Sequence, residues 1–264
     1  MRQVSAAEET PIPHRTAPRR AELRKARRAR RMISNVGEVL ITLGCVLLLY
    51  SIYQLLWTNI ETGFAQDSLR DDLVQAWRDP PREPRATKGQ PQQPPPPLGE
   101  AAAIIHIPRL GANFSRVVVE GVRVEDLARG PGHYPGTAMP GQVGNFAVAG
   151  HRATNGEPFR KLDRLDKGDA VVLETREAYY TYVIDSSEIV DPEKVSAILP
   201  VPHRPGARPE RPLITLTTCH PRWASTHRLI VYGHLGAKQP KRDGPPPALT
   251  DGDSGNGGNT GGSG

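Results

Sequence analysis

TLTTC, at residues 215–219, is the most informative segment of this chain. The run at 213–218 is apolar and rich in β-branched residues, which is the composition of a strand. Pro221 follows closely and should end the strand, because proline cannot donate to a sheet ladder. Cys219 is therefore expected where a strand of a rigid scaffold meets a loop.

Cys219 is one of two cysteines, and the other, Cys45, lies in an apolar N-terminal run. A single cysteine in an exported domain has no partner for a structural disulfide, so it is a candidate reactive thiol. The alternative is a small buried hydrophobe, which is what free cysteine usually is. The segment alone does not decide between the two.

Residues 36–57 form a nearly unbroken apolar run with one acidic residue, Glu38. About 22 residues are enough to cross a bilayer core at about 1.5 Å per residue. The apolar part of a signal peptide is usually shorter, about 7–15 residues, and ends at a small-residue cleavage site. This run instead ends in Tyr53 and Trp57, which is typical of an interfacial anchor. We therefore expect an uncleaved transmembrane anchor.

Basic residues are concentrated before this run, and they predict its orientation. Those before it are Arg2, Arg15, Arg19, Arg20, Arg24, Lys25, Arg27, Arg28, Arg30 and Arg31. Only Arg70 is basic between residues 58 and 77. The positive-inside rule then predicts a cytoplasmic tail at 1–35 and an extracytoplasmic C-terminal part. The same arginines favour topology and anionic-lipid contact over nucleic-acid binding, so no nucleic-acid partner is expected.

The remainder divides by composition into three parts. Residues 58–100 are expected to form a stalk and a Pro-rich linker, ending near four consecutive prolines at 94–97. Such a linker favours extended polyproline II and acts as a spacer; a PxxP ligand is the alternative. Residues 101–235 suffice for one single-core domain. Residues 236–264 are rich in Gly, Ser, Asp, Asn and Pro, and a disordered tail is expected there.

The central domain is predicted to be mainly β. Candidate strands lie at 104–107, 114–119, 145–149, 170–175, 180–190, 213–219 and 228–233, and residues 124–129 are a candidate helical turn. Short strands separated by Gly and Pro turns indicate a closed barrel or a sandwich.

Two further side chains are candidates to serve the thiol. A cysteine needs a nearby base or cation to become a good nucleophile, and His151 ends a predicted strand just as Cys219 does. Arg228 opens a strand that can form a hairpin with the cysteine strand, where a guanidinium could bind substrate carbonyls or an oxyanion. An ordinary loop histidine and a solvated arginine are the alternatives.

Other chemistries have weaker support. The chain contains no CxxC, HExxH, GxGxxG or phosphate-binding loop, so no metal or cofactor is expected. A papain-like arrangement is disfavoured by order, because there the cysteine precedes the histidine and begins a helix.

TLTTC at 215–219 resembles the TLxTC signature of sortases, the transpeptidases that attach proteins to Gram-positive cell walls. Residues 132–152 (GHYPGTAMPGQVGNFAVAGHR) look like the segment leading to the sortase catalytic histidine. The TCHP sequence at 218–221, with Arg228 nine residues after Cys219, is similar to class E sortases. The resemblance covers about residues 101–235.

The resemblance implies a sortase-type closed β-barrel of about eight strands with short helices, preceded by the transmembrane helix. It implies Cys219 as nucleophile, His151 as general acid/base and Arg228 as substrate and oxyanion ligand, with Tyr134 and Thr218 as substrate-binding residues. The reaction would cut an LAxTG or LPxTG sorting signal of a secreted protein between Thr and Gly. A peptidoglycan precursor or a pilin amine would then resolve the thioester.

Two other functions share these residues. An anchored, non-catalytic barrel could bind wall components or peptides, with Cys219 merely buried. A hydrolytic thiol protease would differ only in letting water reach the thioester.

Overall fold

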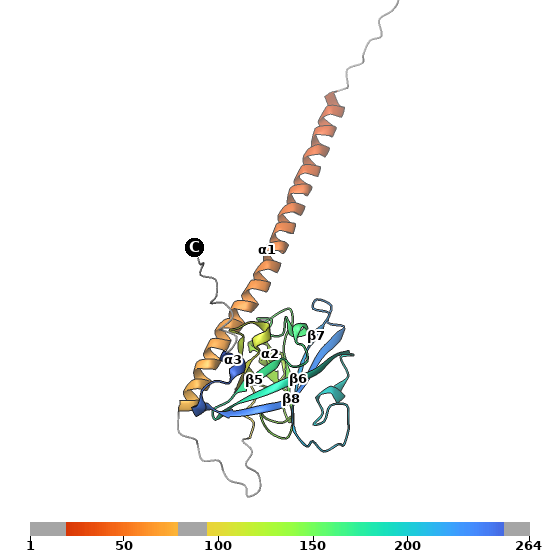
Figure 1. The fold of residues 1–264 in the computed structure, drawn as a ribbon. Coiled ribbons are helices and arrows are strands. Elements are labelled where there is room, and N and C mark those ends of the chain that lie inside the picture. The colour runs from red at the N-terminus through yellow and green to blue at the C-terminus, as the bar shows by residue number, and fades with distance from the viewer. Residues whose placement is uncertain (1–19, 79–93, 251–264) are drawn as a thin grey trace, which may run out of the picture. The chain divides into compact units, whose positions relative to one another are not determined.

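The structure, a computed structural model, describes residues 20–78 and 94–250 (Figure 1). The chain divides into two compact units, Met1–Tyr53 and Gln54–Gly264. The first helix, α1 (Arg20–Arg78), runs through both. Of the stalk and Pro-rich linker expected at 58–100, residues 79–93 lie outside the described residues.

The first unit contains the candidate membrane anchor. Residues Arg30–Tyr53 of α1 form a 24-residue stretch that is long and apolar enough to cross a membrane. Its large apolar side chains are exposed, as expected for a helix that is covered by lipid rather than by protein. The stretch is consistent with the predicted single anchor, although the expected aromatic end at Trp57 lies among side chains outside the described set.

The second unit is a closed eight-stranded barrel, which confirms the predicted fold class and excludes a sandwich. The strands are β1 (Ala101–His106), β2 (Ser115–Glu120), β3 (Gly132–His133), β4 (Gly144–Ala149), β5 (Ala170–Glu174), β6 (Ala178–Val190), β7 (Pro212–His220) and β8 (His227–Pro240). The short helices are η1 (Pro108–Leu110), α2 (Val124–Arg129), η2 (Leu162–Arg164), η3 (Val195–Ile198), η4 (Lys241–Asp243) and α3 (Pro247–Thr250). The order around the barrel is β1-β2-β3-β4-β7-β8-β6-β5.

Alternation along the strands fills the barrel. On β7, Ile214 and Leu216 are buried in the main core with Phe146 and Val148 of β4. The neighbours on β7 therefore point to the other face, because successive strand side chains alternate. This alternation decides which side chains face outward at the end of β7.

The part of α1 after residue 58 belongs to the barrel unit. Leu69 and Leu73 are buried against Ile104 of β1 and Val117 of β2. The side-chain amide of Gln66 donates to the carbonyl of Val117 (3.1 Å) and accepts from its N–H (2.7 Å). This amide substitutes for a neighbouring strand beside β2, where the two-residue β3 does not reach.

The ordered domain is larger than its composition predicted. The stalk expected from residue 58 is helical as far as Arg78, because its apolar face is buried on the barrel. The tail expected from residue 236 is paired with β6 as far as Pro240. Lys241 then lies 4.1 Å from the centre of the Trp77 ring and bonds to Glu174 (2.5 Å). Pairing to a long neighbouring strand outweighs a Gly- and Pro-rich composition here.

Candidate active site

Strands β4 and β7 are parallel neighbours and end at the same rim of the barrel. Their ladder reaches Ala149 opposite Thr217, and the N–H of Gly150 then donates to the carbonyl of Thr217 (3.0 Å). The hydroxyl of Thr218 donates to the carbonyl of Gly150 (2.7 Å). The expected adjacency of the two strand ends is therefore present.

Cys219 lies on the outer face of β7 at this rim. Thr218 is 3% exposed and faces the interior, so alternation turns Cys219 outward. The thiol is partly exposed, in contrast to the neighbouring threonines, which are buried. A buried-hydrophobe role for Cys219 does not fit this placement.

His151 directly follows Gly150, the residue that makes the last backbone hydrogen bond between the β4 and β7 segments. The N–H of Phe159 donates to its carbonyl (3.0 Å), which closes a loop over the rim. A Cβ at Gly150 would meet the Phe159 ring at 2.5 Å, so glycine lets this loop pack closely before the histidine. Burial lowers the pKa of His151 below its ordinary value, because desolvation disfavours the imidazolium.

Arg152 connects the histidine segment to the backbone of the cysteine. It is 6% exposed, and its guanidinium donates to the carbonyl of Cys219 (3.4 Å) and to Nδ1 of His220 (2.8 Å). The second bond makes Nδ1 of His220 an acceptor, so that ring carries its proton on Nε2. Arg152 also pairs with Asp163 at 3.0 Å. The buried guanidinium of Arg152 thus links the segments that follow β4 and end β7.

Arg228 is the register partner of Cys219 in the antiparallel β7–β8 hairpin. Strand alternation therefore puts both side chains on the outer face, as the sequence predicted for a hairpin. Its guanidinium donates to the carbonyls of Ser225 (3.1 Å) and His227 (2.9 Å) on its own loop. Arg228 is therefore near the rim but is held by exposed, local contacts.

The two predicted substrate-binding residues differ in placement. The hydroxyl of Tyr134 lies 3.2 Å from that of Thr217, on the same strand as the thiol. Thr218 instead faces the interior and is bonded to Gly150. The geometry favours a role for Thr218 in holding the strand ends together, and substrate contact by either residue stays a prediction.

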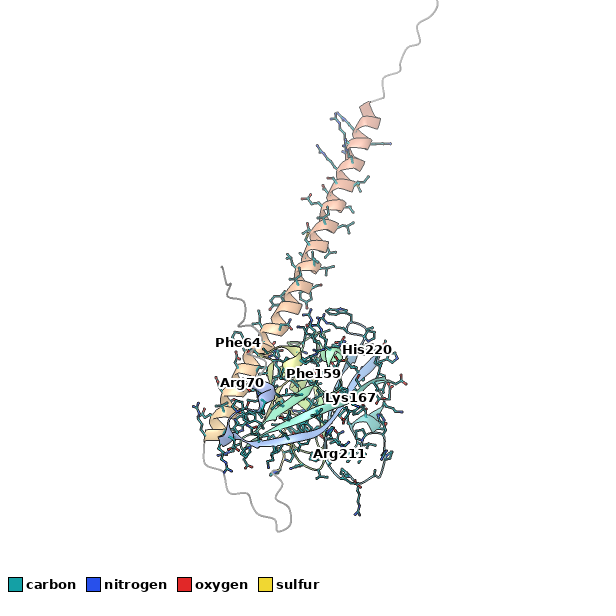
Figure 2. The ribbon with its side chains drawn as sticks, in the orientation of Figure 1. Phe64, Arg70, Phe159, Lys167, Arg211 and His220 are labelled. Carbon is teal, nitrogen blue, oxygen red and sulfur yellow. The ribbon has the colours of Figure 1, made fainter. Side chains whose placement is uncertain are left out.

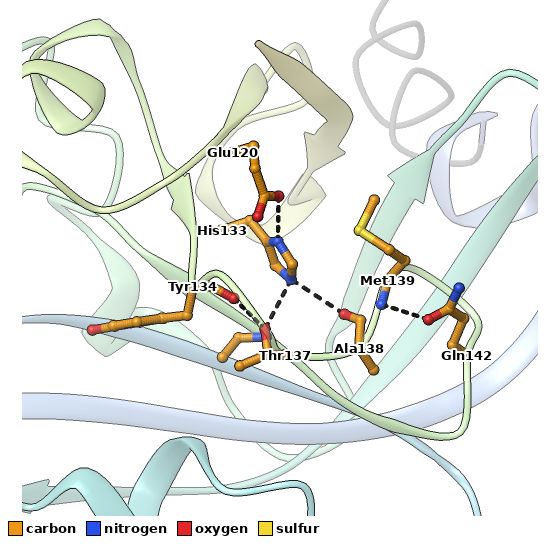
Figure 3. Close-up of polar contacts among 8 residues, drawn as sticks. Glu120, His133, Tyr134, Thr137, Ala138, Met139 and Gln142 are labelled. Atoms are coloured by element: carbon orange, nitrogen blue, oxygen red, sulfur yellow. Dashed lines mark hydrogen bonds and ion pairs between the residues drawn. The ribbon is translucent and has the colours of Figure 1, made fainter. Parts of the chain in front are cut away.

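His133 is fully buried and belongs to a separate polar cluster (Figure 3). Nδ1 of His133 is 2.6 Å from Glu120, and Nε2 is 2.8 Å from the hydroxyl of Thr137. Its ring also stacks on Phe146, with the centroids 4.7 Å apart. Figure 3 shows Tyr134 pointing away from this cluster. His133 therefore supports the loop before β4 and is not accessible to a substrate.

Sequence reasoning missed three charged residues that organise the rim: Arg152, Glu157 and Arg222. Arg222, after β7, donates from one guanidinium nitrogen, Nη2, to both carboxylate oxygens of Glu157, each 2.8 Å away. Arg152 adjoins His151 and Arg222 is three residues after Cys219, so adjacency was the only signal. Pairing across 65 and more residues cannot be read from local composition.

Comparisons with known proteins agree with this fold. A sortase-domain family model matches residues 105–236. The chain is 36% identical over 251 residues to sortase SrtE1 of Streptomyces coelicolor, covering 92% of this chain and 68% of that protein.

Two solved structures are similar in fold. Sortase E from Streptomyces avermitilis matches with a TM-score of 0.53 and 46% identity, covering 58% of this chain and 98% of that one. Sortase E1 from Streptomyces coelicolor, solved with a tripeptide in the active site, matches with a TM-score of 0.52 and 39% identity, covering 57% and 97%.

Proposed function

Because the chain belongs to the sortase family of cysteine transpeptidases, we propose that it cleaves an LAxTG- or LPxTG-type sorting signal and transfers the Thr acyl group to an amine. The observation that carries the proposal is the convergence of Cys219, the His151 segment and Arg228 at one barrel rim. A peptide substrate also agrees with the tripeptide in the active site of the similar Streptomyces coelicolor enzyme.

The first half-reaction forms a thioester on Cys219. The sulfur attacks the carbonyl carbon of the signal's Thr, and neutral His151 accepts the thiol proton. The Thr–Gly C–N bond then breaks, and His151 returns that proton to the leaving glycine amine. The lowered pKa of His151 supports this cycle, because it keeps the imidazole neutral and ready to accept a proton.

The second half-reaction releases the product. An amine of a peptidoglycan precursor or of a pilin lysine attacks the thioester carbonyl. His151 takes a proton from this amine and gives it to the departing sulfur, which restores the thiol. Splitting one amide exchange into two steps is the usual gain from covalent catalysis.

Arg228 is proposed as the ligand for the substrate carbonyls and the tetrahedral oxyanion. A guanidinium offers several donors in a fixed plane, which suits two neighbouring carbonyl oxygens. For Arg228 to do so, its side chain must exchange the carbonyls of Ser225 and His227 for the substrate. Those bonds are exposed, so the exchange costs little.

Two features support a binding path along the outer face. The hydroxyl of Tyr134 lies 3.2 Å from that of Thr217, two residues before the nucleophile, and Tyr134 is the proposed contact for the second residue of the signal. Farther along β7 and β8, a hollow of about 450 Å³ is lined by residues that include Glu188, His203 and Tyr232. Tyr232 pairs with Thr215 in register, four residues from Cys219 on the same face.

The proposed localisation is a single-pass membrane protein with a cytoplasmic N-terminus. Its support is the candidate span Arg30–Tyr53, preceded by an Arg-rich segment. Protease added to intact protoplasts should remove the barrel and spare roughly the first 30 residues. Protection of the barrel would reverse the orientation.

The decisive test incubates the full-length protein with LAxTG and LPxTG peptides and an amine such as triglycine, and identifies products by mass. The transpeptidase predicts an amine adduct at Thr and a thioester on Cys219 that Cys219→Ala abolishes. More than a few per cent of activity in Cys219→Ala would remove the nucleophile from the proposal. Hydrolysed product alone would indicate a thiol protease, and no product together with an unreactive thiol would indicate a binding barrel.

A further inference from the structure

We propose that residues 59–78 of α1 position the catalytic rim, with Asn59 as the contact that transmits this positioning to the loops around Cys219. The segment then works as part of the catalytic unit and is more than a tether. This inference rests on the proposed function, because its effect is measured on transfer from the thioester-forming enzyme.

The contact is made with a tight turn in the loop that begins at His151. Asn155, Gly156 and Glu157 have φ values of +50°, +70° and +46°, so three consecutive residues occupy the left-handed region. Two of them carry side chains, for which this conformation is uncommon. Such a turn persists only where its surroundings hold it, so its partners are informative.

The helix is one of those partners. The N–H of Gly156 donates to Oδ1 of Asn59 (2.9 Å). A Cβ at Gly156 would lie 3.0 Å from Cγ2 of Thr62, so the turn rests on the helix surface. Asn59 thus accepts from a backbone donor in the loop that starts at His151. The bond is exposed to solvent, so Asn59 acts by fixing the direction of the turn, which a water molecule would not do, and not by the strength of the bond.

The same turn is joined to the loop that follows Cys219. Both carboxylate oxygens of Glu157 lie 2.8 Å from the same guanidinium nitrogen of Arg222, Nη2, which donates to them. Arg222 also lies over the ring of Trp223, 4.5 Å from its centre. This β7–β8 loop contains Ser225, whose carbonyl holds Arg228. One turn therefore touches the helix on one side and the Arg228 loop on the other.

The segment 59–78 of α1 is held firmly against the barrel, so it can fix the position of the turn. Beyond Asn59, the hydroxyl of Thr62 donates to the carbonyl of Ala128 (2.8 Å), and Gln66 donates to the carbonyl of Arg129 (2.7 Å). Leu69 and Leu73 are buried on the barrel. Contacts along about four turns hold this segment, so Asn59 presents its oxygen from a rigid surface.

The first experiment compares full-length variants in nanodiscs. Asn59→Leu keeps the size but loses the acceptor, and the acylation rate should fall about tenfold, because small misplacements of reacting groups are costly. Asn59→Asp keeps an oxygen acceptor and should stay within about twofold of wild type. Phe64→Ala changes a 72% exposed residue of the same helix (Figure 2) and should have no effect.

Two readouts separate positioning from general damage. Hydrogen exchange at the Gly156 amide should accelerate in Asn59→Leu, while the melting temperature changes little. Alkylation of Cys219 by iodoacetamide should keep its rate, because the thiol itself is untouched. An equal loss in Asn59→Asp and Asn59→Leu would overturn the role of the acceptor oxygen.

The second experiment is a double-mutant cycle with Glu157→Ala. If the helix acts through the turn, Asn59→Leu should have little further effect once Glu157 no longer holds Arg222. Fully multiplicative losses would show independent actions and refute the proposal. A wild-type protein that forms no thioester would instead refute the proposed function, whereas an active wild type matched by Asn59→Leu refutes only this inference.

Discussion

The two sides of the rim are built in different ways. On the β4–β7 side, the backbone of Gly150 is bonded twice to β7, and the buried Arg152 binds the carbonyl of Cys219. On the β8 side, the hydrogen bonds of Arg228 within the described part of the chain go to carbonyls of its own exposed loop. Buried bonds are costly to leave unmade, whereas exposed ones exchange readily with water.

This difference assigns separate tasks to the two sides. The β4–β7 side fixes the backbone beside Cys219 and His151, the proposed nucleophile and acid/base, before any substrate arrives. The β8 side supplies a charge that can turn toward the substrate when it binds. Substitutions on the β4–β7 side should lower turnover or destabilise the fold. On the β8 side, the effect of a substitution should depend on how many hydrogen-bond donors it keeps and how they are arranged.

The largest effect among the variants that retain the nucleophile is expected at the rigid side. His151→Ala should lower turnover about 10²- to 10⁴-fold, the usual scale for general acid–base catalysis. Steady-state transpeptidation with a fluorogenic signal peptide measures this. His227→Ala, at an exposed position on β8, is the matched control and should cost little.

His133→Ala tests the assignment of His151 as acid/base, because it should lower the free energy of unfolding and not the catalytic rate. Removing this ring leaves the side chain of Glu120 buried without its hydrogen-bond partner, which typically costs about 1–3 kcal/mol. Chemical denaturation should therefore reveal a destabilised protein whose folded fraction keeps most of its activity. A stable but inactive His133→Ala would mean that the acid/base has been misplaced.

Arg228→Ala should lower the acylation rate roughly 10²- to 10³-fold, as expected for the loss of one oxyanion donor worth about 2.7–4 kcal/mol. Arg228→Lys keeps the charge without the planar fork, so it should recover only part of that loss. Pre-steady-state acylation rates measure both. Equal rates for Lys and Arg would reduce Arg228 to a point charge, and equal rates for Ala and Arg would exclude it from the site.

Thr218→Val is expected to have a smaller effect, of about tenfold on acylation. It removes the hydroxyl that donates to the Gly150 carbonyl, and an unsatisfied buried acceptor costs about 1–3 kcal/mol. Melting temperature and acylation rate should fall together. Thr226→Val, at an exposed hydroxyl of the β7–β8 loop, should change neither.

The smallest expected effect is a displaced pH profile. Because burial lowers the pKa of His151, the neutral base persists as the pH falls through the ordinary histidine range. The acidic limb of kcat/KM should therefore lie below 6.5, the reference value. A limb at or above 7 would show that a nearby anion outweighs desolvation, or that another group titrates.

Local composition predicted much of the fold and of the candidate site. β-Branched runs indicated the strands at 145–149 and 213–219, and these strands are neighbours whose ends adjoin at Ala149 and Thr217, as expected. The roles of His151 and Cys219 beyond those ends stay predictions. Pairing of Arg228 opposite Cys219 also followed the predicted hairpin.

What the sequence could not predict depends on partners far along the chain. Residues 236–240 are ordered because β6 is long enough to pair with them. In the sequence, Gln66 and Asn59 are ordinary polar residues of the expected stalk. In the structure, they accept hydrogen bonds from the backbone N–H groups of Val117 and Gly156. Their contacts span 51 and 97 residues, beyond the reach of any local pattern.

The closure of the barrel limits how the protein can recognise a peptide. Among the described residues, β5 closes on β1, and the amide of Gln66 blocks part of the edge of β2. An incoming peptide therefore finds little free ladder to extend, and cannot be selected by main-chain pairing alone. Selection would then depend on the side chains of the peptide more than on its backbone. Selection of that kind tolerates any residue at a peptide position that contacts no pocket. The same short signal can therefore be carried by otherwise unrelated proteins.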